Sequence, residues 1–269
     1  MSTNQNNKGF TLVEMSIVLV IIGLIVGGVL VGQDLVKSAQ IRATVTQLEQ
    51  YNAAMNTFRG KYNAMPGDIS KAVIFGVGAA GQDGNGNGRL DDDATAIVTG
   101  NVEVGFAEEL NWFWIHLSNA NMVGGNYDAD VTTGTSATNY EAGFNFPATK
   151  LKKGGILAVS DGSINYWVIG VEPSILGAAT IIAGAGGAIN PTEAYGMDSK
   201  LDDGFSNAGQ MQMLTSVGLD TDGFGRVLGA SAPSPTTCWA TDPTIDDNPV
   251  DYFLANEGNI CALTVRIQG

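Results

Sequence analysis

Basic residues are scarce in this sequence. Its 269 residues include 13 lysines and arginines against 27 aspartates and glutamates, which gives a formal net charge of −14. A protein that binds nucleic acid needs clustered lysine and arginine side chains to neutralise phosphates. We therefore expect no direct contact with nucleic acid.

Catalytic signatures are also scarce. The one histidine, His116, has no second histidine and no cysteine near it in the sequence, which makes it a poor metal ligand. The Gly-x-Ser-x-Gly and Walker patterns are absent. The two cysteines, Cys238 and Cys261, are too few to supply both a nucleophile and a disulfide. These absences argue against an enzyme.

An apolar run extends over about 22 residues, from Phe10 to Val31. As a helix it would span roughly 33 Å, close to the roughly 30 Å hydrocarbon core of a bilayer. A secretory signal is the rival interpretation, because it also places a basic residue before an apolar stretch. The run is long for a signal core, however, and no Ala-x-Ala-like cleavage site follows it. We expect a membrane helix with Lys8 on the cytoplasmic side.

An amphipathic pattern follows this run. Apolar residues recur at steps of three and four up to Tyr62, which predicts a single helix of about 80 Å that begins at Phe10. Met65-Pro66-Gly67 should end it, because proline cannot continue the helical hydrogen-bond ladder. The face expected to pack on a domain comprises Ile41, Val45, Leu48, Met55, Phe58 and Tyr62, with Gln47, Glu49, Gln50, Asn56 and Arg59 on other faces.

The stretch "KGFTLVEMSIVLVIIG" closely resembles the class III signal of type IV pilins and type II secretion pseudopilins. A second stretch, "FRGKYNAMPGD", resembles the junction after the long helix in a subset of proteobacterial pilin-like proteins. The resemblance implies that a prepilin peptidase cuts between Gly9 and Phe10 and methylates the new amine of Phe10. It also implies two further kinds of partner: other pilin or pseudopilin subunits and an inner-membrane assembly platform.

Glu14 is a carboxylate inside the apolar run. An ionised side chain at the centre of a membrane helix costs about 2.5 to 3.5 kcal/mol on insertion scales, so a partner is expected. Cleavage after Gly9 would create a cation one helical turn away. The resemblance implies that Glu14 pairs with the N-terminal amine of a neighbouring subunit during filament assembly. The alternative is a glutamate near the edge of the span that reaches interfacial water.

Four glycines interrupt the apolar run and weaken its helical preference. Gly28 and Gly32 have the small-x-x-x-small spacing that allows close helix packing. Local unwinding of the helix during assembly is the other interpretation. Many relatives have a proline in this region and this chain has none, so whether the helix unwinds stays open. The four are Gly23, Gly27, Gly28 and Gly32.

The chain after Pro66 has the pattern of a single α+β head. Apolar spacing predicts a helix from about Glu103 to Asn121, with Val104, Ala107, Leu110, Trp114 and Leu117 on one face. Residues 154–170 form two β-rich runs around Asp161-Gly162, a dipeptide favoured in tight hairpins. Asn190-Pro191-Thr192-Glu193 predicts the start of a short helix. "ICALTVRIQ" alternates like a closing antiparallel strand.

Cys238 and Cys261 are the candidate disulfide. The alternative is two free buried thiols, but the head of an exported protein enters an oxidising compartment, which favours the bridge. A closed loop of about 24 residues would stabilise the fold by roughly 3 to 3.5 kcal/mol in the chain-entropy model.

The stretch "DGNGNGRLDDD" follows the order of an EF-hand calcium loop. Its side-chain oxygens alternate along the chain and Gly88 allows the sharp turn. The twelfth position, however, is Ala94 in place of the usual glutamate. A plain Gly/Asn turn with solvated acids is the alternative, as it is for Asp202-Asp203, Asp220, Asp222 and Asp246-Asp247. Calcium is the one cofactor considered for this chain. Its expected ligands are Asp83, Asn85, Asn87 and Asp91.

Together these patterns predict a pilin-like α+β protein whose long N-terminal helix packs on an antiparallel β-sheet head with long loops. We expect a leader at 1–9, an assembly helix at 10–32, its amphipathic half at 33–65 and a periplasmic head at 66–269. Before assembly the chain would cross the bacterial inner membrane once, and afterwards it would be part of a type IV pilus or type II secretion pseudopilus, as a minor or specialised subunit. The alternative function is a membrane-tethered periplasmic enzyme or binding protein.

Overall fold

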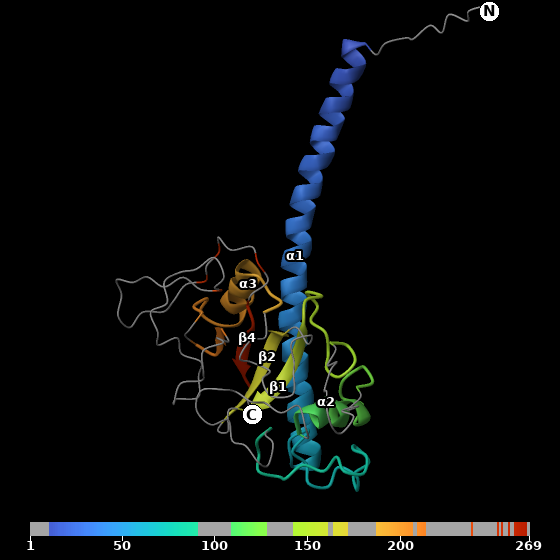
Figure 1. Ribbon diagram of the computed structural model, residues 1–269, viewed down its shortest axis with the longest axis vertical. Helices are drawn as coiled ribbons and strands as arrows, with labels where there is room; N and C mark the ends of the chain where they lie inside the picture. Colours follow the sequence, from blue (N-terminus) through green and yellow to red (C-terminus); the bar gives the residue numbers. More distant parts are fainter. Residues whose placement is uncertain are drawn as a thin grey trace, which may run out of the picture. The chain divides into compact units, whose positions relative to one another are not determined.

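The computed structural model describes residues 11–90, 109–127, 142–160, 164–171, 187–206, 209–213 and 261–267, together with residues 238, 252, 254 and 258. The chain divides into two compact units, Met1–Gln40 and Ile41–Gly269. The elements, labelled in Figure 1, are α1 (Leu12–Tyr62), α2 (Glu109–Asn119), β1 (Gly155–Ser160), β2 (Asn165–Val171), α3 (Pro191–Leu201), β3 (Met211–Met213) and β4 (Leu263–Arg266). A long N-terminal apolar helix and a small antiparallel sheet confirm the expected pilin-like α+β class.

The described part of the first unit is one helical stretch. From Leu12 to Gln40 the helix α1 is unbroken, and every residue except Gly32 and Gln40 is exposed. The helix continues through all four glycines, and a Cβ atom added at any of them would meet nothing within 4 Å. In this structure the glycines therefore leave a smooth helical surface and cause no unwinding.

The second unit is built on a four-stranded sheet in the order β1-β2-β4-β3, with every neighbouring pair antiparallel. β1 and β2 form the expected hairpin, whose tip at residues 161–163 lies outside the described residues. β4, the expected closing strand, inserts between β2 and β3 and pairs Val265 with both Trp167 and Met211. All six residues of β1 are buried, so both faces of the sheet are covered there.

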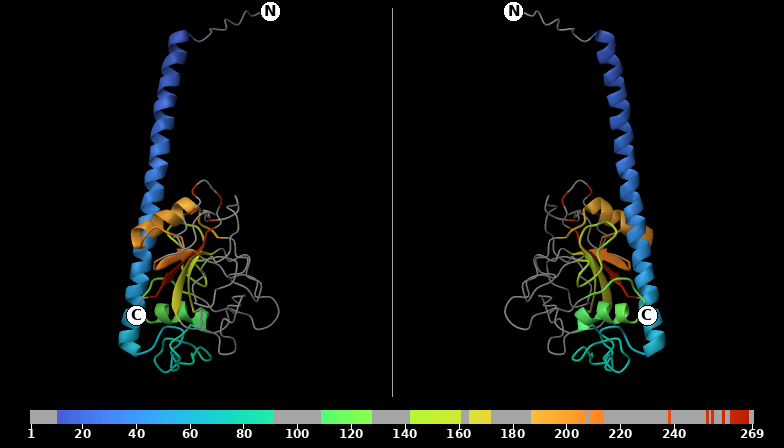
Figure 2. Two further views of the ribbon diagram at one scale, coloured as in Figure 1. Left: turned by 90° about the vertical axis from the view of Figure 1, so that its left-hand side faces the viewer. Right: turned by 90° about the vertical axis from the view of Figure 1, so that its right-hand side faces the viewer.

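Within this unit, residues 41–62 of α1 lie along the sheet, with α2 and α3 toward opposite ends (Figure 2). Four of the six apolar residues expected on the packing face are buried, and Val45 and Tyr62 are partly buried. Gln47 was expected on another face and is buried, so that expectation is wrong. Its side-chain amide donates to the carbonyl of Ala148 (2.9 Å) and accepts from the backbone N–H of Lys150 (3.1 Å), which offsets the cost of burying it.

An aromatic cluster joins α1, α2 and the sheet. The rings of Tyr51 and Trp114 meet edge to face with centroids 4.8 Å apart, and the Trp114 and Trp167 centroids are 5.6 Å apart. The Trp167 indole N–H donates to Asn52 on α1 (2.7 Å). Phe113 contacts both tryptophan rings. Phe113 and Trp114 are thus core residues, and this core fixes the head around residues 41–62.

α1 ends at Tyr62, three residues before the expected boundary at Met65. Asn63 adopts a left-handed conformation (φ 51°) and its N–H still bonds to the carbonyl of Arg59 (2.8 Å). Asparagine tolerates this conformation better than most residues, so it stops the helix before proline can. Met65 itself is buried in the core.

The two shorter helices follow the sequence pattern. α2 occupies 109–119 within the expected range of 103–121, and it buries Leu110, Trp114 and Leu117; residues 101–108 lie outside the described residues. α3 begins with a complete capping box. Its Glu193 N–H donates to the Asn190 side chain (2.8 Å) while the Asn190 N–H donates to the Glu193 carboxylate (3.1 Å). The capping box therefore marks the start of this helix from four consecutive residues.

Candidate functional site

The N-terminal end of α1 carries a capping box around Glu14. Thr11 donates from both its backbone N–H and its hydroxyl to the same Glu14 carboxylate oxygen, each over 2.8 Å, and the Glu14 N–H points back to the Thr11 hydroxyl (3.3 Å). This reciprocal arrangement satisfies donors that every helix start leaves unpaired. The predicted assembly residue therefore has a defined position. The role of Thr11 was missed, although the Thr-x-x-Glu spacing signals it.

Gly9 and Phe10, the predicted cleavage and methylation positions, lie outside the described residues. Phe10 directly precedes Thr11 in the chain, so cleavage there would place the new amine next to the residue that holds Glu14. The processing steps themselves stay predictions.

The surface that follows Glu14 is apolar on every side. An 18-residue window in α1 has a mean hydropathy of 2.8 and none of it is buried, so this helix is long and apolar enough to cross a membrane. Its large apolar side chains are exposed from Leu12 to Val36, between 46% and 90%. Exposure of such an apolar surface to water is unfavourable, so lipid or other helices must cover it.

The predicted calcium loop is an ordered chain of turns. The Asn85 side-chain oxygen accepts from the Asn87 N–H (2.8 Å), and the Asn87 oxygen accepts from the Arg89 N–H (2.7 Å). Asp83 instead accepts from the N–H of Val73 (3.2 Å). The contacts made by the two asparagine side chains are Asx turns. Asp91 lies outside the described residues, so the calcium set is not assembled here and stays a prediction.

Two buried carboxylates that sequence reasoning missed hold this loop. Asp68 accepts from the N–H groups of Asn87 (2.9 Å) and Gly88 (2.8 Å), one on each oxygen. Glu109, in the first turn of α2, accepts from the N–H of Asn85 (2.8 Å). Each of the two carboxylate residues is only 2% exposed. No local signal reveals them, because their partners lie about 20 residues away in the sequence.

His116 is a structural residue of the core. Its Nδ1 accepts from the N–H of Gly67 (2.9 Å), and its Nε2 lies 3.1 Å from the carbonyl of Gln82, to which it must donate. These two contacts fix the neutral tautomer. Burial lowers the pKa of His116 from its ordinary 6.5 to about 4, against smaller opposing contributions from Gln82 and Asp83. The side chain therefore fits no acid–base role near neutral pH, as the sequence suggests.

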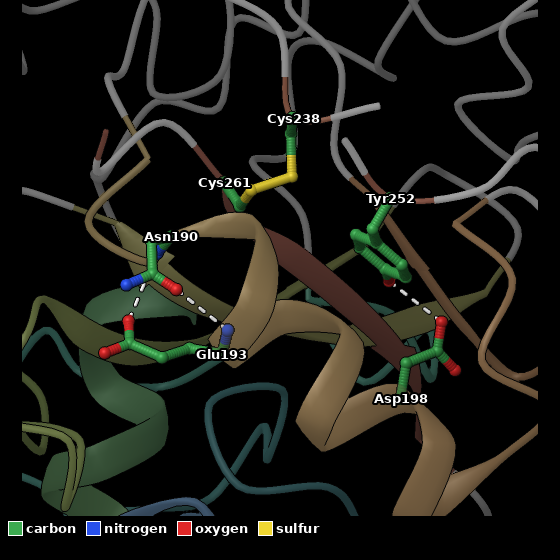
Figure 3. The surroundings of a disulfide bond; sticks show 6 residues. All are labelled: Asn190, Glu193, Asp198, Cys238, Tyr252 and Cys261. Atoms are coloured by element: carbon green, nitrogen blue, oxygen red, sulfur yellow. Dashed lines mark hydrogen bonds between the residues drawn. A yellow bond between two sulfur atoms is a disulfide. The ribbon is translucent and has the colours of Figure 1, made fainter. Parts of the chain in front are cut away.

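The predicted disulfide is present between Cys238 and Cys261, whose Cα atoms are 5.3 Å apart (Figure 3). Both cysteines are buried. The backbone of Cys261 also exchanges two hydrogen bonds with Ile189, just before α3 (3.1 and 2.8 Å). The bridge thus ties residue 238 to the start of the β4 segment and, through Ile189, to the start of α3.

A second tie to α3 comes from Tyr252, whose hydroxyl donates to the buried carboxylate of Asp198 over 2.8 Å (Figure 3). Burial is the main cause that raises the pKa of Asp198 from 3.8 to about 7, and nearby Asp203 and Asp202 add to it. The hydrogen bonds from Tyr252 and from the Gly204 N–H oppose this rise. The charge of Asp198 is therefore sensitive to pH near neutrality.

The carboxylate oxygens of Asp198, Asp202 and Asp203 lie within 4.8 Å of one another. Asp202 accepts from the N–H groups of Gln210 and Met211, and Asp203 accepts from the N–H of Phe205 (2.9 Å). Asp202 and Asp203 were expected to be solvated loop faces, and Asp203 is exposed. Both also satisfy backbone donors between α3 and β3. Asp220, Asp222, Asp246 and Asp247 lie outside the described residues.

Comparison with protein families gives one finding. Residues 4–30 match the prokaryotic N-terminal methylation motif. Neither the comparison with curated proteins nor that with solved structures gives a match. The matched segment contains Gly9, Phe10 and Glu14 and leads into the exposed apolar helix. The match supports the resemblance of this N-terminal segment to prepilins of the type IV pilin and pseudopilin type.

Proposed function

We propose that this protein is a structural subunit of a type IV pilus or type II secretion pseudopilus. A prepilin peptidase would remove residues 1–9 and methylate Phe10, and the mature chain would join other subunits through α1. The observation that carries this proposal is that one segment combines the methylation motif, a positioned carboxylate at Glu14 and an apolar surface exposed on all sides.

The apolar surface of α1 would be covered in two successive environments, first by lipid and then by other subunits. Before assembly, the apolar part of α1 would anchor the chain in the inner membrane, with the head in the periplasm. During assembly, α1 would leave the lipid and pack against α1 of other subunits, so apolar area would stay out of water throughout. The periplasmic location is supported by the buried disulfide between Cys238 and Cys261, because such bonds persist in oxidising compartments.

Glu14 would set the register of this packing. Its carboxylate stands in the first turn of α1, where a charge inside a helix bundle needs a partner of opposite charge. The new amine of Phe10 on a neighbouring subunit would supply that partner. A subunit shifted along the bundle would leave both charges unpaired, so the correct stagger would be favoured over its alternatives.

The head favours a minor or specialised subunit over a bulk one. Residues 66–269 are a large head for a bulk pilin. An acidic, loop-rich head is suited to contact with a substrate or surface at a filament tip.

Calcium binding by the loop that starts at Asp83 is a separate proposal. Its support is the alternation of Asp83, Asn85 and Asn87 and the positive φ of Gly86 (78°) and Gly88 (84°), which lets the backbone curl. The side-chain oxygens of these three residues each accept a backbone N–H, which holds them in place. Within 83–90 the loop offers one carboxylate, so further negative charge would come from Asp91.

Mass spectrometry of the mature N-terminus tests the main proposal. The chain should be isolated from cells with an active prepilin peptidase, and from matched cells that lack the enzyme. We expect a methylated Phe10 at the N-terminus in the first sample and Met1 or Ser2 in the second. A chain that keeps residues 1–9 in both samples would refute processing and with it the proposed route of assembly.

A further inference from the structure

The loop at 83–90 contains two Asn-Gly pairs, Asn85-Gly86 and Asn87-Gly88. Asn-Gly is a reactive dipeptide, because glycine places no side chain in the way of its own backbone nitrogen. That nitrogen loses its proton and forms a bond to Cγ of the asparagine, the bond from Cγ to Nδ2 breaks, and ammonia leaves. Water then opens the resulting succinimide to aspartate or isoaspartate. Water is the one co-reactant of this sequence.

The structure occupies both attacking nitrogens. The Gly88 N–H donates to the side-chain Oδ2 of Asp68 (2.8 Å), and the Gly86 N–H donates to the main-chain carbonyl of the same residue (3.0 Å). A proton held by a carboxylate is hard to remove, because the anion left behind would face a second negative charge. Only the bond at Gly88 depends on the Asp68 side chain.

The electrophile is also held in place at this pair. The Asn87 side-chain oxygen accepts from the Arg89 N–H (2.7 Å), and the Asn87 N–H donates to Asp68 Oδ1 (2.9 Å). These two hydrogen bonds therefore hold the side chain and the backbone of Asn87 in place. The carbon that would be attacked, Cγ, lies between them. We propose that Asn87-Gly88 is a latent deamidation site that the buried carboxylate of Asp68 keeps unreactive.

The reaction would change the loop permanently. Deamidation would convert the Asn87 amide into a carboxylate beside Asp68, which is 2% exposed and already accepts two N–H bonds from this loop. The new carboxylate would belong to the residue whose backbone N–H Asp68 holds, so the two like charges would repel each other. An isoaspartate would in addition reroute the backbone through the side chain. A loop that opened and reacted would not return to the arrangement described here.

The test measures deamidation at both asparagines in one molecule. The full chain and its Asp68→Asn variant are incubated in detergent with a chelator, so that no bound cation contributes. Peptide mass spectrometry then follows the replacement of each side-chain amide by a carboxyl group. We expect the rate at Asn87 to rise about 10- to 100-fold in the variant, because a hydrogen bond to a charged group is lost. The rate at Asn85 should rise much less, because Asp68→Asn keeps the main-chain carbonyl that holds Gly86.

A second measurement uses the unaltered chain in its native state and in denaturant. Both asparagines should react at similar rates when unfolded, and both should be slower when native. Native Asn87 that reacts as fast as unfolded Asn87 would overturn the protection. An Asp68→Asn variant with no change at Asn87, or with equal increases at Asn87 and Asn85, would overturn the assignment to the Asp68 carboxylate.

Discussion

Tyr252 donates its hydroxyl proton to the carboxylate of Asp198 over 2.8 Å, and both residues are buried although 54 positions separate them in the sequence. The contact joins the segment between Cys238 and Cys261 to the middle of α3. Burial raises the pKa of the Tyr252 hydroxyl as well, so this phenol stays protonated and is always the donor. The contact of Tyr252 with α3 therefore involves a carboxylate whose pKa is raised to about 7.

This pKa predicts that Asp198 makes the head less stable as the pH rises. Between about 4 and 7 the folded chain binds more protons at Asp198 than the unfolded chain, whose pKa there is near 3.8. The contribution is fully present below about pH 4 and is lost as the pH rises through about 7. As the pH rises from about 4 to 7, the stability of Asp198→Asn relative to wild type should therefore increase.

Thermal unfolding of the full chain in detergent, followed by circular dichroism at several pH values, measures this difference. Asp34→Asn, at an exposed carboxylate in the first unit, is the control and should track wild type. A constant difference between Asp198→Asn and wild type at every pH would contradict the prediction.

His116 predicts the opposite pH dependence. Its pKa is lowered from 6.5 to about 4, so the folded chain binds fewer protons than the unfolded chain between these values. The contribution is present above about pH 6.5 and is lost as the pH falls through about 4, by roughly 3 kcal/mol at most. His116→Gln keeps one hydrogen-bond acceptor and one donor. As the pH falls, this variant should therefore become more stable relative to wild type.

The same unfolding experiment tests the histidine. In wild type the effects of Asp198 and His116 oppose each other over most of the acidic range, so each variant should unmask the pH dependence of the other group. If His116→Gln followed wild type at every pH, His116 would not be the buried neutral base described here.

Features set by local chemistry could be predicted from the sequence. The start of α3 follows from Asn190 and Glu193, whose capping box needs only four consecutive residues. The hairpin of β1 and β2 and the closing strand β4 follow from alternation of apolar residues. The disulfide could be predicted because the chain has two cysteines, which allow one pairing.

Features that depend on distant partners were not predictable. Gln47 looked like a surface residue on its helix, yet a strand-like segment about 100 residues later satisfies its amide in the core. Asp68 carries no sequence signal of its role, because only the fold brings the N–H groups of Asn87 and Gly88 onto its oxygens. The insertion of β4 between β2 and β3 also has no local signal, because antiparallel pairing sets no limit on sequence separation.

Loss of the disulfide should weaken the head. Replacing Cys238 and Cys261 together by serine removes a covalent link over a separation of 23 residues, which is expected to cost about 3 kcal/mol of unfolding free energy. Denaturant unfolding of the full chain, with and without reductant, measures the loss. Reductant should lower the midpoint of wild type and leave the double variant unchanged. A wild-type midpoint that is insensitive to complete reduction would refute a stabilising role for the bridge.

Calcium should bind the loop at Asp83 if the sequence pattern is a true cation site. Isothermal titration of the full chain in detergent is expected to show saturable heat with calcium, and Asp83→Asn should weaken binding because a carboxylate ligand is lost. Asp203→Asn is the matched control, since it alters a distant acid in the group that contains Asp198 and Asp202. No heat from wild type would remove the proposal, and weakening by Asp203→Asn alone would relocate the site.

Thr11 should matter to assembly because it positions Glu14. Thr11→Val keeps the shape of the side chain but removes the hydroxyl that donates to the Glu14 carboxylate and accepts from its N–H (2.8 and 3.3 Å). The backbone bond from the Thr11 N–H is retained, so loss of one cap interaction should cost about 0.5 to 2 kcal/mol in helix stability.

Incorporation into filaments should therefore fall partially in Thr11→Val and completely in Glu14→Ala, whereas membrane insertion should be unchanged in both. Quantitative blotting of sheared filaments against the membrane fraction gives both values for each variant. Ser16→Ala serves as the control, because its hydroxyl bonds within the helix to the carbonyl of Val13 and does not touch Glu14. Normal incorporation of Glu14→Ala would remove the pairing role, because a filament that tolerates an uncharged residue at this position needs no partner for the Phe10 amine.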